Sequence, residues 1–422
     1  MTNHTSILKE PPLGLRWFVL FVVSIAMFGN YYVYDSISPL ADILAKQLNF
    51  TDDNIGLLQG IYSLPNIIMV AVGGMIIDRI GTRKANFLFS ALCMIGSFLT
   101  FIKGDLITMA LGRLIFGLGA ESLIVSITTT LAKWFKGKEL SFAFGLNLTI
   151  ARLGSFAALN SPSWAKPFYE SWQGPLLISF IASIVSVVAV SSYYIVDIWA
   201  RKKFILHQEQ KQGKINISQA FKFGLPFWFI TFLCVTFYSA IFPFQTFAIK
   251  FFQEVHNVSR QMAGFLSSIL TLSAMIMTPI FGFIVDKIGH RAKLMILGSL
   301  LIVPVYLIMV YTKITLFIPM SIMGIAFSLI PAVMWPSVAY VVDDDKLGTA
   351  YGVMTMVQNI GLFTTNLLIG YLNEMTNAYT TGMWFFSFFG IFGVFFGYLL
   401  LKSNRKSTKF DLEKPKFSLN EG

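Results

Sequence analysis

A ten-residue motif occurs twice in this chain, as GMIIDRIGTR at residues 74–83 and as GFIVDKIGHR at residues 282–291. The second copy starts 208 residues after the first. A shorter pair, AFGL at 143–146 and AYGV at 350–353, has nearly the same offset of 207 residues. Two independent matches at almost one spacing indicate that the chain consists of two related halves.

Composition decides the class of protein to which these halves belong. The 422 residues are 55% hydrophobic and 13% charged, which is too little charge to cover the surface of a soluble protein of this size. The apolar residues fall into blocks of about 20, the length that a helix needs to cross a bilayer. Strands of membrane barrels are shorter and alternate in polarity. We therefore predict an all-α membrane protein.

The apolar blocks predict twelve transmembrane helices, six in each half. Their approximate ranges are 15–38, 54–77, 83–102, 105–131, 138–160, 174–198, 225–249, 258–285, 292–312, 314–338, 346–372 and 380–402. The longest polar stretch lies between the sixth and seventh blocks and predicts a linker. The expected organisation is an N-terminal tail (1–14), a six-helix bundle (15–198), a linker (199–224), a second bundle (225–402) and a C-terminal tail (403–422).

The distribution of Lys and Arg predicts the orientation in the membrane. With both termini in the cytosol, 24 of the 32 basic residues lie in cytosolic segments and six in the opposite loops, as the positive-inside rule requires. The net charge of +11 therefore sits in loops, so nucleic acid is not an expected partner. The four histidines lie at the chain's start or in loops, and we expect no metal site and no cofactor. No catalytic motif is present, so no enzyme is expected.

The repeated motif combines small residues with charges at a helix end. Its first glycine permits close helix approach, its acidic residue can pair with basic groups across an interface, and its second glycine suits a tight turn. Both copies follow an even-numbered span, so the halves have the same orientation. The residues expected to take part in gating are Gly74, Asp78, Arg79, Gly81, Arg83, Gly282, Asp286, Lys287, Gly289 and Arg291. The alternative is a charged turn that is merely solvated.

The pattern resembles the signature of the major facilitator superfamily. The resemblance implies a fold of two pseudo-symmetric six-helix bundles, in which this motif latches the cytosolic side while the carrier faces outward. Residues 113–119, RLIFGLG, resemble a second motif of that superfamily. Arg113 lies near the outer edge of the fourth span by helix rise, where a proton-linked role and a structural or snorkelling role are both open.

Two ionisable residues, Glu121 and Arg152, are expected near the middle of the membrane. Glu121 lies 12 residues from Lys133 and Arg152 lies 14 residues from Lys138, which places them about 18 and about 21 Å from the cytosolic boundary. One interpretation is a buried structural ion pair. The other is a clamp for a zwitterion, in which Arg152 binds a carboxylate and Glu121 receives an ammonium group. The two can coexist if the solute inserts into a resting pair.

Further candidates surround this pair. The repeat offset maps Arg152 onto Asn359, so Gln358 and Asn359 are expected to face it from the eleventh span. Aromatic candidates for the same site are Tyr31, Tyr34, Tyr238 and Trp335, each of which can equally be packing. Asp35, near the outer end of the first span, is a candidate for an outer gate or for proton coupling. Glu121 and Arg113 are further candidates for proton coupling.

Longer segments resemble one branch of the superfamily, that of the major facilitator superfamily domain-containing protein one. These segments are NYYVYD (30–35), YSLPN (62–66), FGLGAESL (116–123), WFKGKEL (134–140), ARLGS (151–155), FPF (242–244), WP (335–336) and LGTAYG (347–352). The animal protein of that branch is a lysosomal dipeptide uniporter, and the resemblance places its binding Glu and Arg on Glu121 and Arg152.

We therefore expect an alternating-access transporter that carries a dipeptide or a similar small zwitterion across a lipid bilayer. The alternative within carriers is a proton-coupled transporter of organic anions, amino acids or drugs. A membrane enzyme or receptor is the alternative from another class. The sequence has no acidic dileucine signal at its N-terminus and only short tails, which favours a bacterial inner membrane over a lysosome. Because one chain contains both halves, we expect a functional monomer.

Overall fold

The computed structural model describes residues 10–135, 139–204, 206, 221–343 and 346–415. Lys138, the outer parts of both predicted tails and most of the predicted linker lie outside these residues. Within them, twelve helical segments are long and apolar enough to cross a membrane. The prediction of an all-helical protein with twelve spans is confirmed.

The first half of the chain forms the helices that we call the N-half. They are α1 (Leu13–Asp35), η1 (Ser38–Leu40), α2 (Ala41–Leu48), α3 (Asp52–Gly60), α4 (Ser63–Ile80), α5 (Thr82–Ile102), α6 (Leu106–Phe135), α7 (Leu140–Leu159), α8 (Ser161–Trp164), η2 (Lys166–Glu170) and α9 (Gln173–Lys203). One apolar core joins α1, α4, α5, α6, α7 and α9.

The second half of the chain forms the C-half. Its helices are α11 (Leu225–His256), α12 (Arg260–Ile288), α13 (Arg291–Tyr311), α14 (Phe317–Val341), α15 (Leu347–Thr376) and α16 (Tyr379–Lys406). A second apolar core joins these six helices. Three buried residues of the N-half, Ala41, Ile55 and Leu159, pack against this second core. Since the rest of each core lies within one half, each half can move as a body against the other.

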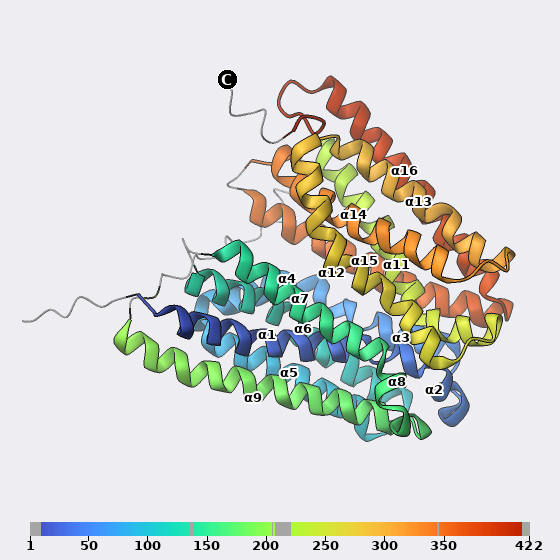
Figure 1. The fold of residues 1–422 in the computed structure, drawn as a ribbon, viewed down its shortest axis with the longest axis horizontal. Helices are drawn as coiled ribbons and strands as arrows, with labels where there is room; N and C mark the ends of the chain where they lie inside the picture. The colour runs from blue at the N-terminus through green and yellow to red at the C-terminus, as the bar shows by residue number, and fades with distance from the viewer. Residues whose placement is uncertain (1–9, 136–138, 205, 207–220, 344–345, 416–422) are drawn as a thin grey trace, which may run out of the picture.

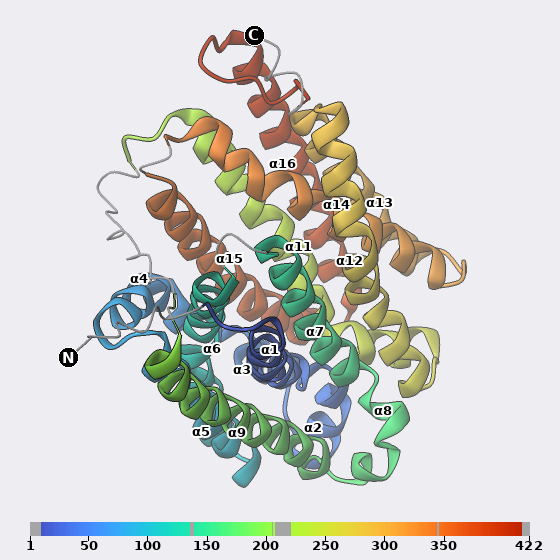
Figure 2. The same ribbon diagram turned by 60° about the vertical axis from the view of Figure 1, so that its left-hand side comes forward.

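The two halves lie side by side, with the C-half above the N-half in Figures 1 and 2. The start of α1 and the end of α16 lie on one side of the bundle, which we call the terminal side; α2 and α8 lie on the opposite, far side. The halves converge towards the far side and diverge towards the terminal side (Figure 1). The seam between them is formed chiefly by α15 against α3 and α4, by α12 against α7, and by η1 against α11.

The first two spans are interrupted in ways that the sequence did not predict. In the first span, α1 ends at Asp35 and the chain continues through η1 into α2, beyond the predicted end near residue 38. The second span is broken at Ile61 and Tyr62, between α3 and α4. The break has a local cause, because Pro65 has no N–H to donate to the carbonyl of Ile61, four residues earlier. A capping box of Thr51 and Asn54 starts the short helix α3.

Both copies of the repeated motif end in the predicted tight turn. Gly81 and Gly289 have φ of +79° and +69°, values that favour glycine. Each follows directly on a helix, α4 in the N-half and α12 in the C-half. The glycines therefore let each chain turn sharply from one span into the next.

Candidate functional site

A cavity of about 230 Å³ lies between the halves. Its walls come from α1, α6 and α7 of the N-half, from α11 and α15 of the C-half, and from the break between α3 and α4. The residues expected at the site that line it are Tyr31, Tyr34, Asp35, Glu121, Arg152, Tyr238 and Gln358. On α1 the first three share one face, as spacings of three and four residues require. The cavity therefore contains two carboxylates and one guanidinium.

Glu121 is held by a tyrosine that was not among the residues expected from the sequence. The Tyr62 hydroxyl donates a hydrogen bond of 3.0 Å to Oε1 of Glu121. The Tyr62 ring packs between Tyr34 and Phe116, at centroid distances of 4.9 and 5.5 Å. One carboxylate oxygen is thus oriented by Tyr62, and the carboxylate can accept further donors.

Arg152 lies among aromatic rings rather than against a carboxylate. Its guanidinium carbon is 5.7 Å from the centroid of the Tyr31 ring and 5.5 Å from that of Phe327, within the range of cation–π attraction. Among the described residues, no ion pair joins Arg152 to Glu121. The structural ion pair considered from sequence is therefore not formed in this conformation.

Two predicted residues lie behind the cavity wall. The Trp335 indole N–H donates to the Tyr238 hydroxyl at 3.0 Å, so Trp335 supports a lining residue without lining the cavity itself. Asn359 is 2% exposed, and its Nδ2 donates to the carbonyl of Thr355 in its own helix. The repeat offset located the correct turn of α15, but its neighbour Gln358 has the side chain that faces the cavity.

Arg113 makes contacts that favour a structural role. The side chain is 1% exposed and donates to the carbonyls of Leu58, Val33 and Tyr34 and to Oε1 of Gln59. These carbonyls lie in the last turns of α3 and α1, where helices have unpaired acceptors. Snorkelling of Arg113 to the membrane edge is excluded by this burial. Its proton-linked role stays a prediction.

The repeated motif lies on the terminal side, and an arginine of each copy pairs within its own half. Arg83 is 3.8 Å from Oδ2 of Asp197 in α9, and Arg291 is 3.2 Å from Oδ1 of Asp286. The close helix approach expected at Gly282 is absent, because a Cβ there would meet nothing within 4 Å. In the first copy of the motif Gly74 is buried, whereas Asp78 and Arg79 are exposed. In the second copy Lys287 is exposed as well. The gating role of the motif stays a prediction.

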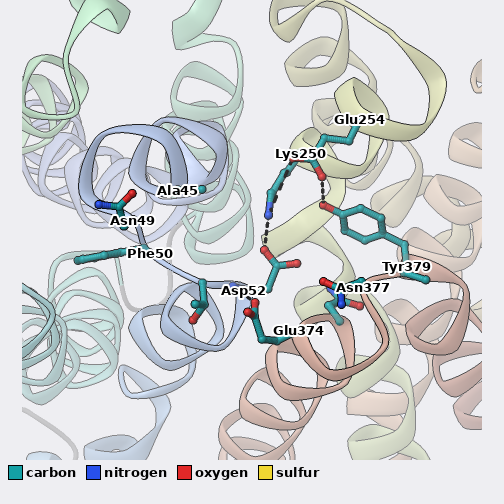
Figure 3. A pocket seen from close by; sticks show the side chains of 12 residues that line it. Ala45, Asn49, Phe50, Asp52, Lys250, Glu254, Glu374, Asn377 and Tyr379 are labelled. Carbon is teal, nitrogen blue, oxygen red and sulfur yellow. Dashed lines mark hydrogen bonds and ion pairs between the residues drawn. The ribbon is translucent and has the colours of Figure 1, made fainter.

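The far side is joined by charges from both halves. Lys250 at the end of α11 pairs with Asp52 at the start of α3, and Arg260 of α12 pairs with Asp42 of α2 at 2.5 Å. The backbone N–H of Asp52 also donates to Glu374 of α15. The first pair lines a polar hollow of about 400 Å³. Figure 3 shows this pair, with Tyr379 donating to Glu254 beside it. We call the contacts of Asp42, Asp52, Lys250 and Arg260 the far-side clasp.

The sequence did not predict two parts of this arrangement, namely six of the cavity-lining residues and the far-side clasp. The six residues are Asn30, Tyr62, Ile124, Ser155, Phe242 and Leu362. For Tyr62 the available signal was the proline three residues later, which indicates a break in the helix at the cavity. The clasp was missed because its members lie at predicted span ends, where charges are common. Opposite charges on spans of the two halves at matching depth were the signal for it.

Comparisons with known proteins agree with this architecture. The sequence profile described as "Major Facilitator Superfamily" matches residues 23–363 and 227–421. The chain is 34% identical over 374 residues to "Lysosomal dipeptide transporter MFSD1" of Bos taurus, covering 85% of this chain and 79% of the relative. It is 33% identical to the Homo sapiens protein of the same name, with 85% and 80% covered.

Among solved structures, "Crystal structure of nucleoside transporter NupG" has a TM-score of 0.74 at 15% identity, covering 91% of this chain and 99% of that one. This likeness concerns the fold. Together with the profile match and the transporter relatives, it identifies a multi-pass membrane transporter rather than an enzyme: the chain belongs to the Major Facilitator Superfamily.

Proposed function

We propose that this chain is an alternating-access carrier of a small zwitterion, most simply a dipeptide, which binds in the cavity between the halves. Arg152 binds the carboxylate of the solute and Glu121 binds its ammonium group. Tyr31, Tyr34, Tyr238 and Gln358 surround the solute between them. Both ends of every dipeptide carry the same charges, so one pair of residues serves many side chains.

The observation that carries this proposal is the placement of opposite charges at Glu121 and Arg152. Both line one cavity, from consecutive spans, without being paired to each other. Charges buried among spans are costly and need a partner, which a zwitterion supplies at both ends. The name of the mammalian relatives, a dipeptide transporter, supports the same class of solute.

The described conformation corresponds to one end of an alternating-access cycle. The far side is joined by the clasp, while the halves diverge on the terminal side (Figure 1). We place both termini in the cytosol on the distribution of Lys and Arg, which makes this the cytosol-facing state. The repeated motif would then join the halves in the opposite state. In this proposal the two bundles are joined by the linker at 199–224, and a single chain acts as a functional monomer.

Asp35 supports a second candidate, proton-coupled transport. It is a further carboxylate in the same cavity and is 9% exposed. When ionised, Asp35 and Glu121 together carry two negative charges, against one positive charge on Arg152. A zwitterion has no net charge, so one negative charge in the cavity lining stays unbalanced when it binds. A proton carried on Asp35 or Glu121 would remove this excess. Solute flux that responds to an imposed pH gradient, and loses that response in Asp35→Asn, would identify coupling; an unaltered response would exclude Asp35.

The membrane that holds the chain is a separate part of the proposal. A bacterial inner membrane was favoured from the sequence, and the comparisons give that prediction no support, since the mammalian relatives are named as lysosomal. Fractionation of cells that express the native gene, with membrane markers for each compartment, decides this point.

The test of the zwitterion clamp is ligand-induced thermal stabilisation of the purified protein. A ligand that binds only the folded state raises the melting temperature. We expect dipeptides to stabilise the wild type, and Arg152→Ala to weaken their affinity by about thirtyfold or more, since an unpaired buried charge costs ~2 kcal/mol or more. Glu121→Gln should behave similarly.

The matched control is Arg405→Ala, which removes an exposed arginine at the end of α16. It should respond to dipeptides as the wild type does. Stabilisation by dipeptides that survives in Arg152→Ala would refute the clamp. A response to organic anions alone would move the substrate class to the alternative.

A further inference from the structure

The break in the second span lies next to both the cavity and the far-side seam. On one side of it, α3 ends at Gly60; on the other, α4 starts at Ser63. The first piece packs against the C-half so closely that a Cβ on Gly56 would lie 2.5 Å from the carbonyl oxygen of Asn366. The second piece belongs to the apolar core of the N-half. The two pieces therefore bury apolar residues in different cores, since α3 places Ile55 in the core of the C-half, although both pieces contact α15.

Tyr62 stands at the joint between these pieces. Its backbone belongs to the break, its ring packs against Tyr34 and Phe116, and its hydroxyl donates to Glu121. Arg113 fixes the α3 side of the joint by bonding the carbonyl of Leu58 and the side chain of Gln59. The hydroxyl of Tyr62 thus links the carboxylate of Glu121 to the backbone at the break between α3 and α4.

We propose that Tyr62 is a positioning residue that orients Glu121 and couples the cavity to α3, which acts as a far-side gate hinged at Ile61 and Tyr62. At its outer end, α3 carries Asp52, which Lys250 of the C-half binds. A change at Glu121 reaches Asp52 through Tyr62 and one short helix. The part of this inference that concerns ligand binding rests on the proposed role of Glu121; the gate does not.

A cysteine introduced by Ser38→Cys, which we call the seam reporter, follows the state of the far side. Ser38 is 6% exposed, and its hydroxyl donates to the carbonyl of Gln245 across the seam. A membrane-impermeant maleimide should label the seam reporter slowly while the far side is closed and faster as it opens. The native Cys93 and Cys234 are buried, and the protein without the Ser38 change gives the background rate.

The variant is Tyr62→Phe, which removes one hydroxyl and keeps the ring. Hydrogen bonds to charged groups contribute enough that we expect the affinity for a dipeptide to fall about tenfold. Made together with Ser38→Cys, it should also label about tenfold faster without ligand, since the joint loses its hydrogen bond to Glu121 and keeps only the ring contact of residue 62 with Phe116 and the bonds of Arg113. With the native Tyr62 the dipeptide should change the labelling rate of the seam reporter, and in Tyr62→Phe that change should shrink.

Tyr306→Phe is the matched control, because it removes a buried hydroxyl that donates to the Ala240 carbonyl, away from the cavity lining. It should leave labelling of the seam reporter and dipeptide affinity unchanged. Labelling and affinity that are both unaltered in Tyr62→Phe would overturn the inference. Faster labelling in Tyr62→Phe, without any dipeptide binding in wild type, would keep the gate and reject the proposed substrate class instead.

Discussion

The two ends of this transporter are held together in different ways. On the far side, charges and small residues of one half contact the other half: Lys250 binds Asp52, Arg260 binds Asp42, and Gly56 lies against α15. On the terminal side, a group of ion pairs lies within one half. Asp197 there gathers Lys133, Arg201 and Arg83, all from the N-half.

The difference shows which contacts must break during transport. Pairs within a half stabilise a body that moves as a unit, so they can be strong and numerous. Pairs across the far side must open in each cycle, so they need to be few and reversible. A Cβ on Gly145, Gly282 or Gly348 would meet nothing within 4 Å, which leaves room on the terminal side for the opposite closure.

The largest expected effect is a loss of stability when the ion-pair cluster of Asp197 with Lys133, Arg201 and Arg83, which we call the terminal-side hub, is disrupted. The Asp197 carboxylate is fully buried and accepts from Lys133, itself 3% exposed, at 2.9 Å. Asp197→Asn removes the fully buried negative charge that Lys133, Arg201 and Arg83 share, and should destabilise the protein by about 3–5 kcal/mol. Thermal unfolding measures the loss, and labelling of the seam reporter should remain slow.

The control for the hub is Arg201→Gln, which removes a half-exposed partner of the same carboxylate. It should cost at most about 1 kcal/mol, as exposed pairs do. An equal loss in the two variants would show that burial of Lys133 does not set the cost.

A methyl group at the far-side seam should have the next largest effect. Gly56→Ala places a Cβ 2.5 Å from the Asn366 carbonyl oxygen, and relief of this overlap by separating the halves should favour the open far side by about 1–3 kcal/mol. Faster labelling of the seam reporter would show it. Gly348→Ala, a change into empty space, should not raise that rate; if it does, the seam is not the sensitive region.

Removing one arm of the clasp should have a smaller effect. Lys250→Gln leaves Asp52 next to Glu374 without its cation and should speed labelling of the seam reporter by about tenfold, or ~1.4 kcal/mol. The double exchange Lys250→Asp with Asp52→Lys should restore slow labelling. Failure of the exchange, with a stable protein, would assign the effect of the single variant to packing rather than charge.

The smallest effect concerns a far-side contact within one half. Asp105 accepts the backbone N–H of Thr108 at 2.9 Å at the start of α6. This hydrogen bond, with the Thr108 hydroxyl and the Lys103 ammonium, lowers the pKa of Asp105 from 3.8 to about 2. Because the pKa is lowered in the folded state, the cap contributes stability above about pH 4 and loses it as the pH falls towards 2.

Asp105→Ala should therefore unfold at a slightly lower temperature than wild type at about pH 6, and the difference should narrow at about pH 3. Labelling of the seam reporter should not change, since the cap touches one half only. A rise in labelling equal to that of Lys250→Gln would erase the distinction between cross-half and within-half contacts on this side.

The part of the site that the sequence could predict is the part that follows from helix rise. Glu121 and Arg152 were expected at similar depth on consecutive spans, and the structure places both in one cavity. Side-chain direction was harder, because it changes by about 100° with each residue. Gln358 faces the cavity and Asn359 bonds to its own helix, although the repeat offset selected Asn359.

Tyr62 and the far-side clasp could not be predicted in this way. The break at Ile61 depends on Pro65, but proline also occurs inside continuous helices of this chain, such as Pro243 in α11. The partner of Asp52 lies 198 residues away, so no local pattern connects them. Which charges meet depends on how the halves pack.

The sequence by itself determined the class of the protein, its twelve spans, the repeat of its halves and the two charged residues within consecutive spans, because bilayer thickness and helix rise act on each segment separately. The tertiary structure alone decided that Glu121 bonds to Tyr62, that Arg152 lies on aromatic rings, and that ion pairs join the halves on the far side while the described helices diverge on the terminal side (Figure 1). These features depend on contacts between distant segments, whose free energies exist only once the two halves have packed together.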